Sequence, residues 1–165
     1  MNRIRPSWII CLTVTLFFAF ALWLRVFPPF DKIFTAAGIR FSTVDAYYQM
    51  YIVDNLVHNF PKLTSFLPYL NYPGGHETGG IHFFNWLLAA AIWIVSLGKP
   101  TLHTVDVVGV YYPAVLGALT VIPVYFMGRA LAGRWAGIIA AALIAILPGE
   151  FLGRSILGST DQHVA

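Results

Sequence analysis

The chain has 165 residues, of which 58% are hydrophobic, 16% aromatic and only 10% charged. With a mean hydropathy of +0.72, this composition excludes an ordinary soluble domain, in which about a quarter of the residues are charged, and indicates an integral membrane protein. The net charge of +3 comes from dispersed basic residues, which excludes the dense cationic surface that nucleic acid binding requires.

Residues 8–27 form the first predicted membrane span. The stretch from Trp8 to Leu24 carries no charge, and with its flanks it reaches the roughly 20 residues that cross a hydrocarbon core. Arg3 and Arg5 precede it, so the positive-inside rule places the amino terminus in the cytoplasm. Arg25, at the far end, is expected to extend toward the membrane surface.

A cleaved signal peptide is the alternative for this stretch, because Ala19 and Ala21 form an A-x-A pattern after a basic start. The residues that follow are bulky (22–24) where a cleavage region would turn polar, and this favours the span. Cys11 lies inside the stretch and is the only cysteine, so neither a disulfide framework nor a cysteine zinc site is expected.

Residues 28–104 are predicted to be a long external loop, since prolines, glycines and most polar residues gather in its first part. Within it, residues 44–60 have the spacing of a helix, with Thr43 as its cap and Pro61 after its end. Asp45 falls in the first turn, where a carboxylate is favoured by the exposed backbone amides. Asp45 therefore has a purely structural interpretation beside any functional one.

Two further stretches of the loop are distinctive. Tyr72 to Gly75 (YPGG) predicts a turn, and His76 and Glu77 after it are expected to be solvated. Residues 81–97 are apolar but short for a span.

Whether residues 81–97 cross the membrane decides the topology. If they cross, Arg129 and Arg134 lie outside, against the positive-inside rule, and Asp45 and Asp161 face opposite sides. If residues 81–97 instead form a helix that lies at the interface, the arginines are cytoplasmic and both acids face outside. The second topology is favoured by the short length and by polar and aromatic residues suited to the headgroup level, namely His82, Phe83, Phe84, Asn85, Trp86 and Trp93.

A hairpin of two spans is predicted next, with two prolines in its first arm that neighbouring helices can accommodate. Gly133 and Gly137 form a small-xxx-small pair suited to close helix contact, and Glu150 and Arg154 are spaced to pair on a helix. The predicted segments are span 105–127, cytoplasmic turn 128–134, span 135–149 and external loop 150–165.

The last loop carries Asp161 and His163, two residues apart, so that in an extended segment both side chains point the same way. Oxygen and imidazole ligands suit Mg²⁺, Mn²⁺ or Zn²⁺. A D-x-H pair is common by chance, but Asp45 from another loop on the same membrane face would complete a converging set. Such a cation could offset the charge of a departing phosphate.

Three motifs occur in one order: D-A-Y-Y (Asp45 to Tyr48), Y-P-G-G (Tyr72 to Gly75) and R-S-I-L-G-S-T-D-Q-H (Arg154 to His163). Their combination after a single first span resembles the amino-terminal part of the catalytic subunit of oligosaccharyltransferase. The D-x-H form resembles the archaeal AglB branch of that family, and the resemblance covers essentially the whole chain.

The resemblance implies an all-α integral membrane fold of the GT-C type, with three amino-terminal transmembrane helices, in the cell membrane with its active site on the external face. The implied activity is transfer of an oligosaccharide from a lipid-linked (dolichyl) phosphate or pyrophosphate donor to asparagine of N-x-Ser/Thr sequons in a protein or peptide. On this resemblance Asp45, Asp161 and His163 bind Mn²⁺ or Mg²⁺. Asp45 also contacts the acceptor amide, and Arg154 supports the carboxylates.

The family also requires a later glutamate and a soluble domain with a W-W-D-x-G motif, which this sequence lacks. The chain is therefore expected to be an amino-terminal fragment that is inactive alone. Two alternatives remain open: another GT-C glycosyltransferase that uses a lipid-phosphate sugar, and a non-catalytic transporter or assembly subunit. In the last case, the acids near the spans would line an ion path or contact a partner helix.

Overall fold

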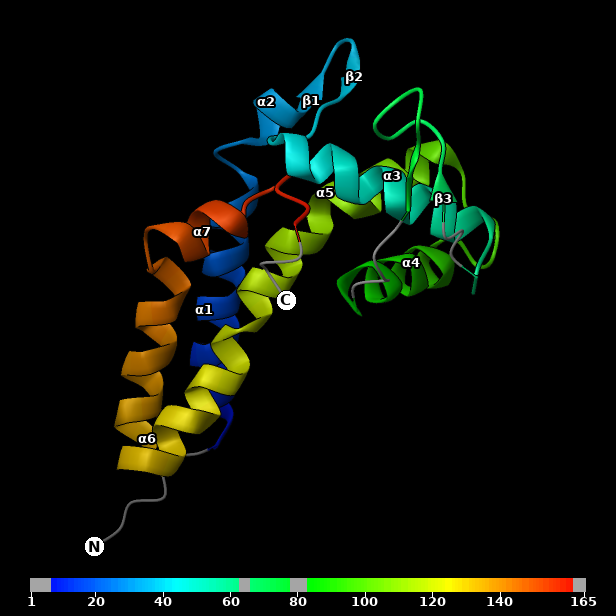
Figure 1. Ribbon diagram of the computed structural model, residues 1–165. Coiled ribbons are helices and arrows are strands. Elements are labelled where there is room, and N and C mark those ends of the chain that lie inside the picture. Colours follow the sequence, from blue (N-terminus) through cyan, green and yellow to red (C-terminus); the bar gives the residue numbers. More distant parts are fainter. Residues whose placement is uncertain (1–6, 63–65, 78–82, 162–165) are drawn as a thin grey trace, which may run out of the picture.

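The computed structural model describes residues 7–62, 66–77 and 83–161, and this part of the chain is mostly helical. Figure 1 shows a long helical arm with a smaller group of helices at one end. The helices are α1 (Ser7–Val26), α2 (Phe30–Ile33), α3 (Val44–His58), α4 (Phe83–Val95), α5 (Leu102–Leu119), α6 (Val121–Ile146) and α7 (Glu150–Arg154).

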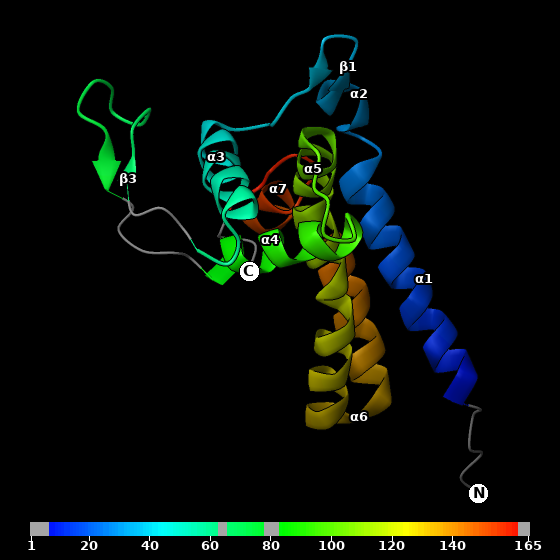
Figure 2. The same ribbon diagram turned by 90° about the vertical axis from the view of Figure 1, so that its right-hand side faces the viewer.

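Two short strand pairs interrupt the helical fold, and the all-α prediction did not include them. Strands β1 (Phe34–Thr35) and β2 (Gly38–Ile39) pair antiparallel, as do β3 (Phe66–Leu67) and β4 (His76–Glu77). Phe34 faces Ile39 in the first pair, and Phe66 faces Glu77 in the second. The predicted turn at Tyr72 to Gly75 lies between β3 and β4, and His76 and Glu77 are exposed as predicted. Figure 2 shows β3 far from α1, on the other side of α3.

The long arm is a helical hairpin that turns inside α6. Ala132 and Gly133 leave the helical conformation there, and Gly133 has φ +83° and ψ 179°, a backbone that only glycine adopts readily. In Figure 1 the chain descends through α5 and the first part of α6 and then returns beside it toward α7. The reversal lies within the stretch 128–134 that the sequence indicated.

Gly137 brings the two arms of the hairpin into close contact, but not with the partner that the sequence suggested. A Cβ on Gly137 would lie 2.6 Å from Tyr125 O and 3.0 Å from Arg129 N, while a Cβ on Gly128 would lie 3.0 Å from the Gly137 Cα. The facing glycines are therefore Gly128 and Gly137. The proposed Gly133–Gly137 pair is wrong because Gly133 forms the turn.

Within the described residues, two stretches are long and apolar enough to cross a membrane: Trp8–Val26 and Leu102–Ile146. The second contains the reversal. Helix α1 packs along the hairpin through a shared apolar cluster. Its buried members are Ala21, Ala118, Val121, Tyr125, Ala141 and Ala145.

Helix α3 packs against α4 and the first part of α5. Apolar residues of its second half, among them Val53 and Leu56, are fully buried in this contact. Trp93 Nε1 donates to Val57 O at 3.1 Å. These contacts fix the direction of α3, whose first residues point back toward the end of the hairpin arm (Figure 1).

Both helices end earlier than the sequence indicated. Helix α3 ends at His58 rather than residue 60, since Asn59 caps it and the residue before Pro61 is disfavoured in helical conformation. Helix α4 ends at Val95 because Leu97 and Gly98 have positive φ, and the Gly98 amide donates back to Trp93 O at 3.0 Å. Residues 81 and 82 of the predicted helix lie outside the described residues.

Candidate functional site

The candidate site lies at the end of the hairpin, where α7 leads into the last described residues. Arg154 Nη1 is 2.9 Å from Asp161 Oδ2, and Arg154 Nε is 3.0 Å from Glu150 Oε2. The predicted Glu150–Arg154 pair is thus confirmed, and Arg154 also reaches Asp161. The hydrogen bonds to Glu150 and Asp161 raise the pKa of Arg154 above its ordinary value, so the guanidinium remains charged at any working pH.

Asp161 is held in a buried position, with 6% of its side chain exposed. A buried carboxylate is costly unless a charge or hydrogen bonds satisfy it, and Arg154 supplies that charge through one carboxylate oxygen. Within the described residues, no hydrogen bond to the other oxygen, Oδ1, competes with a ligand. Asp161 is therefore oriented by one bond while keeping an oxygen for another contact.

Gly158 ties this segment to the start of α3. Ser42 donates to Gly158 O from its amide and from its Oγ, both at 3.0 Å, while the Gly158 amide donates to Val110 O at 2.9 Å. Gly158 has φ +78°, and a Cβ there would lie 2.6 Å from Ile33 Cδ1, so glycine is required on both counts. The segment that contains Gly158 therefore packs between α2 and α5.

Thr160 makes a second attachment, to α5. Its buried hydroxyl donates to Gly109 O at 2.8 Å, and a Cβ on Gly109 would lie 2.5 Å from the end of Met50 in α3. A side chain on Gly109 would therefore require the end of the Met50 side chain to move. The close packing of α3, α5 and residue 160 sets the position of Asp161 next along the chain.

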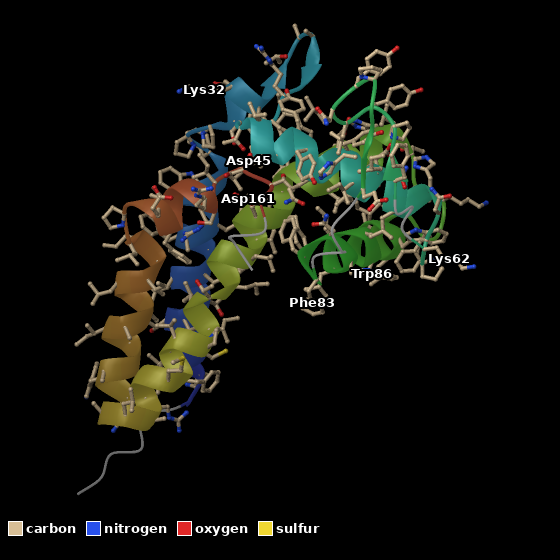
Figure 3. All side chains as sticks on the ribbon, in the orientation of Figure 1. Lys32, Asp45, Lys62, Phe83, Trp86 and Asp161 are labelled. Carbon is tan, nitrogen blue, oxygen red and sulfur yellow. The ribbon has the colours of Figure 1, made fainter. Side chains whose placement is uncertain are left out.

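Asp45 stands at the start of α3, as predicted. Thr43 is the N-cap, and its Oγ1 accepts from the Ala46 amide at 3.2 Å, which confirms the expected cap. Asp45 is exposed in the first helical turn. Because Ser42 is bonded to Gly158, the two acid-bearing segments lie together, and Figure 3 shows Asp45 and Asp161 at the same end of the molecule.

Arg25 anchors the same region from α1, and here the sequence expectation was wrong. Arg25 is fully buried rather than extended toward a membrane surface. Its Nε donates to Ser155 Oγ at 3.0 Å, its Nη1 donates to Ala145 O at 3.2 Å, and its backbone carbonyl accepts from the Leu157 amide at 3.0 Å. The partners come from parts of the chain more than a hundred residues away, which periodicity within α1 could not reveal.

A pocket of about 700 Å³ opens beside Ser42, between the loop after α1 and the segment after α7. Lys32 and Arg40 line it together with Tyr47 and several apolar residues. Two cations and no acidic side chain line this pocket among the described residues, so it suits an anionic group.

Of the four predicted site residues, Arg154 and Asp161 are in direct contact, and Asp45 lies at the same end of the molecule (Figure 3). His163 lies outside the described residues. Among the residues that are described, no group of three or more histidine, cysteine or acidic side chains is close enough to hold a metal ion. The two carboxylates come from separate elements and offer oxygen atoms, which is the donor chemistry that hard divalent cations prefer.

Residues 14–165 match the family model for the amino-terminal part of oligosaccharyl transferase STT3. Dolichyl-monophosphooligosaccharide–protein glycotransferase AglB of Haloferax volcanii is 35% identical over 144 residues, covering 87% of this chain and 14% of that protein. Dolichyl-phosphooligosaccharide-protein glycotransferase 3 of Archaeoglobus fulgidus is 36% identical over 143 residues, covering 86% of this chain and 16% of that protein.

Solved structures of an Archaeoglobus fulgidus oligosaccharyltransferase have the same fold over this region. The AglB structure in complex with an inhibitory peptide and a dolichol-phosphate matches 96% of this chain and 18% of its own, with a TM-score of 0.83 and 32% identity. A structure in complex with Zn and sulfate matches 92% of this chain and 19% of its own, with a TM-score of 0.82 and 34% identity.

Proposed function

Because the chain belongs to the oligosaccharyl transferase STT3 family, we propose that it forms part of an enzyme that glycosylates proteins on asparagine. The reaction is the transfer of an oligosaccharide from a lipid-linked (dolichyl) phosphate donor to the asparagine of an N-x-Ser/Thr sequon. The chain spans 14% and 16% of the two relatives' lengths, so the proposed reaction belongs to an enzyme of their size. The carrying observation is that Ser42 and Gly158 bring the segments of Asp45 and Asp161 together.

The proposed topology has three crossings of the GT-C type in the cell membrane: α1 and the two arms of the hairpin. Arg129 and Arg134 flank the reversal at Gly133, at the end of the molecule where α1 begins (Figure 2). Positive charge at that end supports a cytoplasmic location. Helix α4 would then lie at the external interface, and the site would face outside.

Asp45 and Asp161, with His163, are the residues that would hold a Mn²⁺ or Mg²⁺ ion. When bound, a divalent cation would supply positive charge against the departing lipid phosphate. Arg154 fixes the orientation of Asp161, as outer partners of ligating carboxylates do. The Zn in the related structure supports a divalent site in this family, and the carboxylate donors of this chain favour harder ions.

Asp45 has a second proposed role toward the acceptor. An amide nitrogen is a weak nucleophile because its lone pair is delocalised into the carbonyl. An exposed carboxylate at a helix start is positioned to accept an amide N–H and hold it in one orientation, which lowers the entropic part of the barrier. The inhibitory peptide bound in the related complex supports a peptide as the acceptor.

The test is the turnover of a sequon peptide by the full-length enzyme. Asp45→Ala and Asp161→Ala should each reduce turnover by at least about a hundredfold, since each removes a ligand rather than its outer partner. Asp31→Ala is the control, because Asp31 is an exposed acid of α2, and should turn over as the parent enzyme does. Undiminished turnover of Asp161→Ala at saturating Mn²⁺ would overturn the assignment.

A further inference from the structure

A groove runs along the seam between α1 and the hairpin, at the opposite end from the candidate site. Its first part is a pocket of about 360 Å³ between Ile10 and Arg129. A second pocket of about 210 Å³ continues it to Phe18 and Leu119. The two pockets share Val14, Thr15 and Ile122, so they adjoin along the same seam.

The groove matches one leaflet of a bilayer in length and chemistry. From residue 119 to residue 129 the helical rise is about 15 Å, which equals half of a hydrocarbon core of about 30 Å. Its walls are mostly apolar, and apart from Thr15 in the middle the polar groups lie near one end. Because α1 and the hairpin are both candidate spans, the groove runs in the direction in which lipid chains lie.

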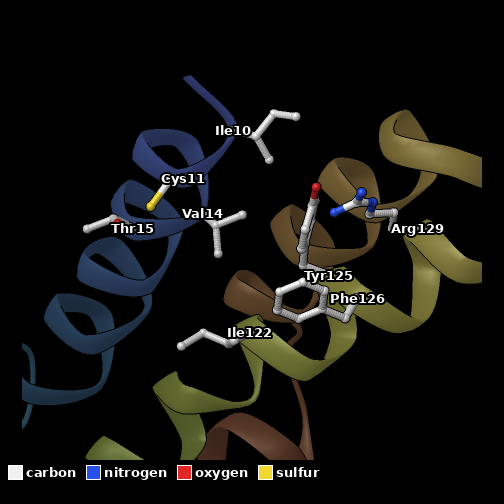
Figure 4. Close-up of a pocket in the computed structure, with 8 residues that line it drawn as sticks. All are labelled: Ile10, Cys11, Val14, Thr15, Ile122, Tyr125, Phe126 and Arg129. Atoms are coloured by element: carbon white, nitrogen blue, oxygen red, sulfur yellow. The ribbon is translucent and has the colours of Figure 1, made fainter. Parts of the chain in front are cut away.

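The end near Ile10 carries two polar groups. Tyr125 is buried, with 3% exposure, and its hydroxyl has no hydrogen-bond partner within the described part of the chain. A buried hydroxyl without a partner costs free energy. Figure 4 shows the Tyr125 hydroxyl beside the guanidinium of Arg129 at this end, with Ile122 at the other.

We propose that this groove binds an anionic phospholipid, with its phosphate at Arg129 and Tyr125 and one acyl chain along the groove toward Leu119. Arg129 supplies a fixed positive charge, and the Tyr125 hydroxyl donates a hydrogen bond to a phosphate oxygen. The phosphate thus satisfies the hydroxyl that the protein leaves unpaired. The acyl chain packs against the apolar walls of the groove.

The ligand is a lipid of the leaflet at which the hairpin turns. Arg134 adds to the positive charge there, and the pocket remains far from Asp45 and Asp161, at the other end of α1 (Figure 3). The binding is therefore separate from the proposed transfer reaction. A failure of either leaves the other standing.

Native mass spectrometry of the full-length protein in detergent tests the proposal, with dioleoyl phosphatidylglycerol and dioleoyl phosphatidylcholine added separately. The phosphatidylglycerol should bind at least about tenfold more tightly, because both lipids carry the phosphate but the choline of phosphatidylcholine adds a positive charge that Arg129 repels. Arg129→Ala should abolish this preference, and Tyr125→Phe should weaken phosphatidylglycerol binding by about threefold to tenfold. Arg134→Ala is the control: it removes the same charge beside the turn but not from the groove, and it should retain the preference.

Occupancy of the groove itself is tested by alkylation of Cys11, which is exposed and lines the groove. Phosphatidylglycerol should slow the modification of Cys11 in the parent protein, and Val14→Trp, which fills the groove, should prevent lipid binding without changing charge. Equal binding of the two lipids would overturn the proposal. Equal losses of phosphatidylglycerol binding in Arg129→Ala and Arg134→Ala would also overturn it, because they would indicate a general attraction of the lipid to the basic turn.

Discussion

Arg154 Nη1 lies 2.9 Å from Asp161 Oδ2, and this bond joins an arginine of α7 to a buried carboxylate seven residues later. The same guanidinium binds Glu150, whose side chain is 87% exposed. The two bonds therefore differ in their contribution to stability. The exposed pair with Glu150 contributes little, whereas the buried carboxylate of Asp161 depends on Arg154 for its charge partner.

Arg154→Ala in the full-length enzyme should reduce turnover by about tenfold to a hundredfold, as does loss of an outer partner of a ligand. The cause is the lost orientation of Asp161, so the apparent affinity for Mn²⁺ should fall as well. Glycosylation of a sequon peptide across a Mn²⁺ titration measures both. Glu150→Gln is the control and should remain within about twofold of the parent, because its bond is exposed; a larger loss than that of Arg154→Ala would contradict the assignment.

Thr160→Val should lower stability by about 1–3 kcal/mol, since it removes the buried donor to Gly109 O and leaves that carbonyl unsatisfied. The matched variant Thr160→Ser keeps the hydroxyl and should lose less. Thermal unfolding in detergent measures the difference. Equal melting temperatures for the two variants would show that the hydroxyl bond does not hold this segment.

Gly137→Ala should separate the arms of the hairpin, because the new Cβ would lie 2.6 Å from the backbone oxygen of Tyr125, which cannot rotate away as a side chain could. Overpacking of this kind costs about 1–3 kcal/mol. Gly153→Ala is the control, since nothing lies within 4 Å of a Cβ there. Alanine at that helical position should stabilise by up to about 1 kcal/mol, and a melting curve of each variant distinguishes the two signs.

Replacing Lys32 and Arg40 together with alanine should raise the KM for the lipid-linked donor by about tenfold or more, if the pocket beside Ser42 receives the anionic part of that donor. The effect should weaken as salt increases, because screening reduces the contribution of exposed charges. Lys62→Ala is the control, as Lys62 is exposed and does not line the pocket. An unchanged donor KM would show that the pocket has another role.

Local chemistry allowed several features to be predicted from the sequence. Thr43 was identified as a cap because its side chain satisfies an amide within three residues. The Glu150–Arg154 pair follows from spacing along one helix, and the reversal within residues 128–134 from a short basic stretch between two apolar segments. In each case the interacting groups are neighbours in the sequence.

The long-range contacts of the site could not be predicted in this way. Gly158 receives Ser42 through a backbone carbonyl, and every residue type has one. Arg25 was expected to be solvated because arginine at a span end usually is, whereas Ala145 O and Ser155 Oγ, supplied by the end of the chain, bury it. Gly158 was the one sequence signal for this contact, because its positive φ and its close approach to Ile33 both require glycine.

The contact of α3 with α4 has a consequence for how relatives of this chain can diversify. Both ends of the excursion that carries β3 and β4 are attached to these helices, through packing and through the bond from Trp93 to Val57. Closing a longer loop between fixed ends costs only about 0.6 kcal/mol for each doubling of its length. A change in the length of this excursion should therefore cost little stability. It should also leave the positions of Asp45 and Asp161 unchanged.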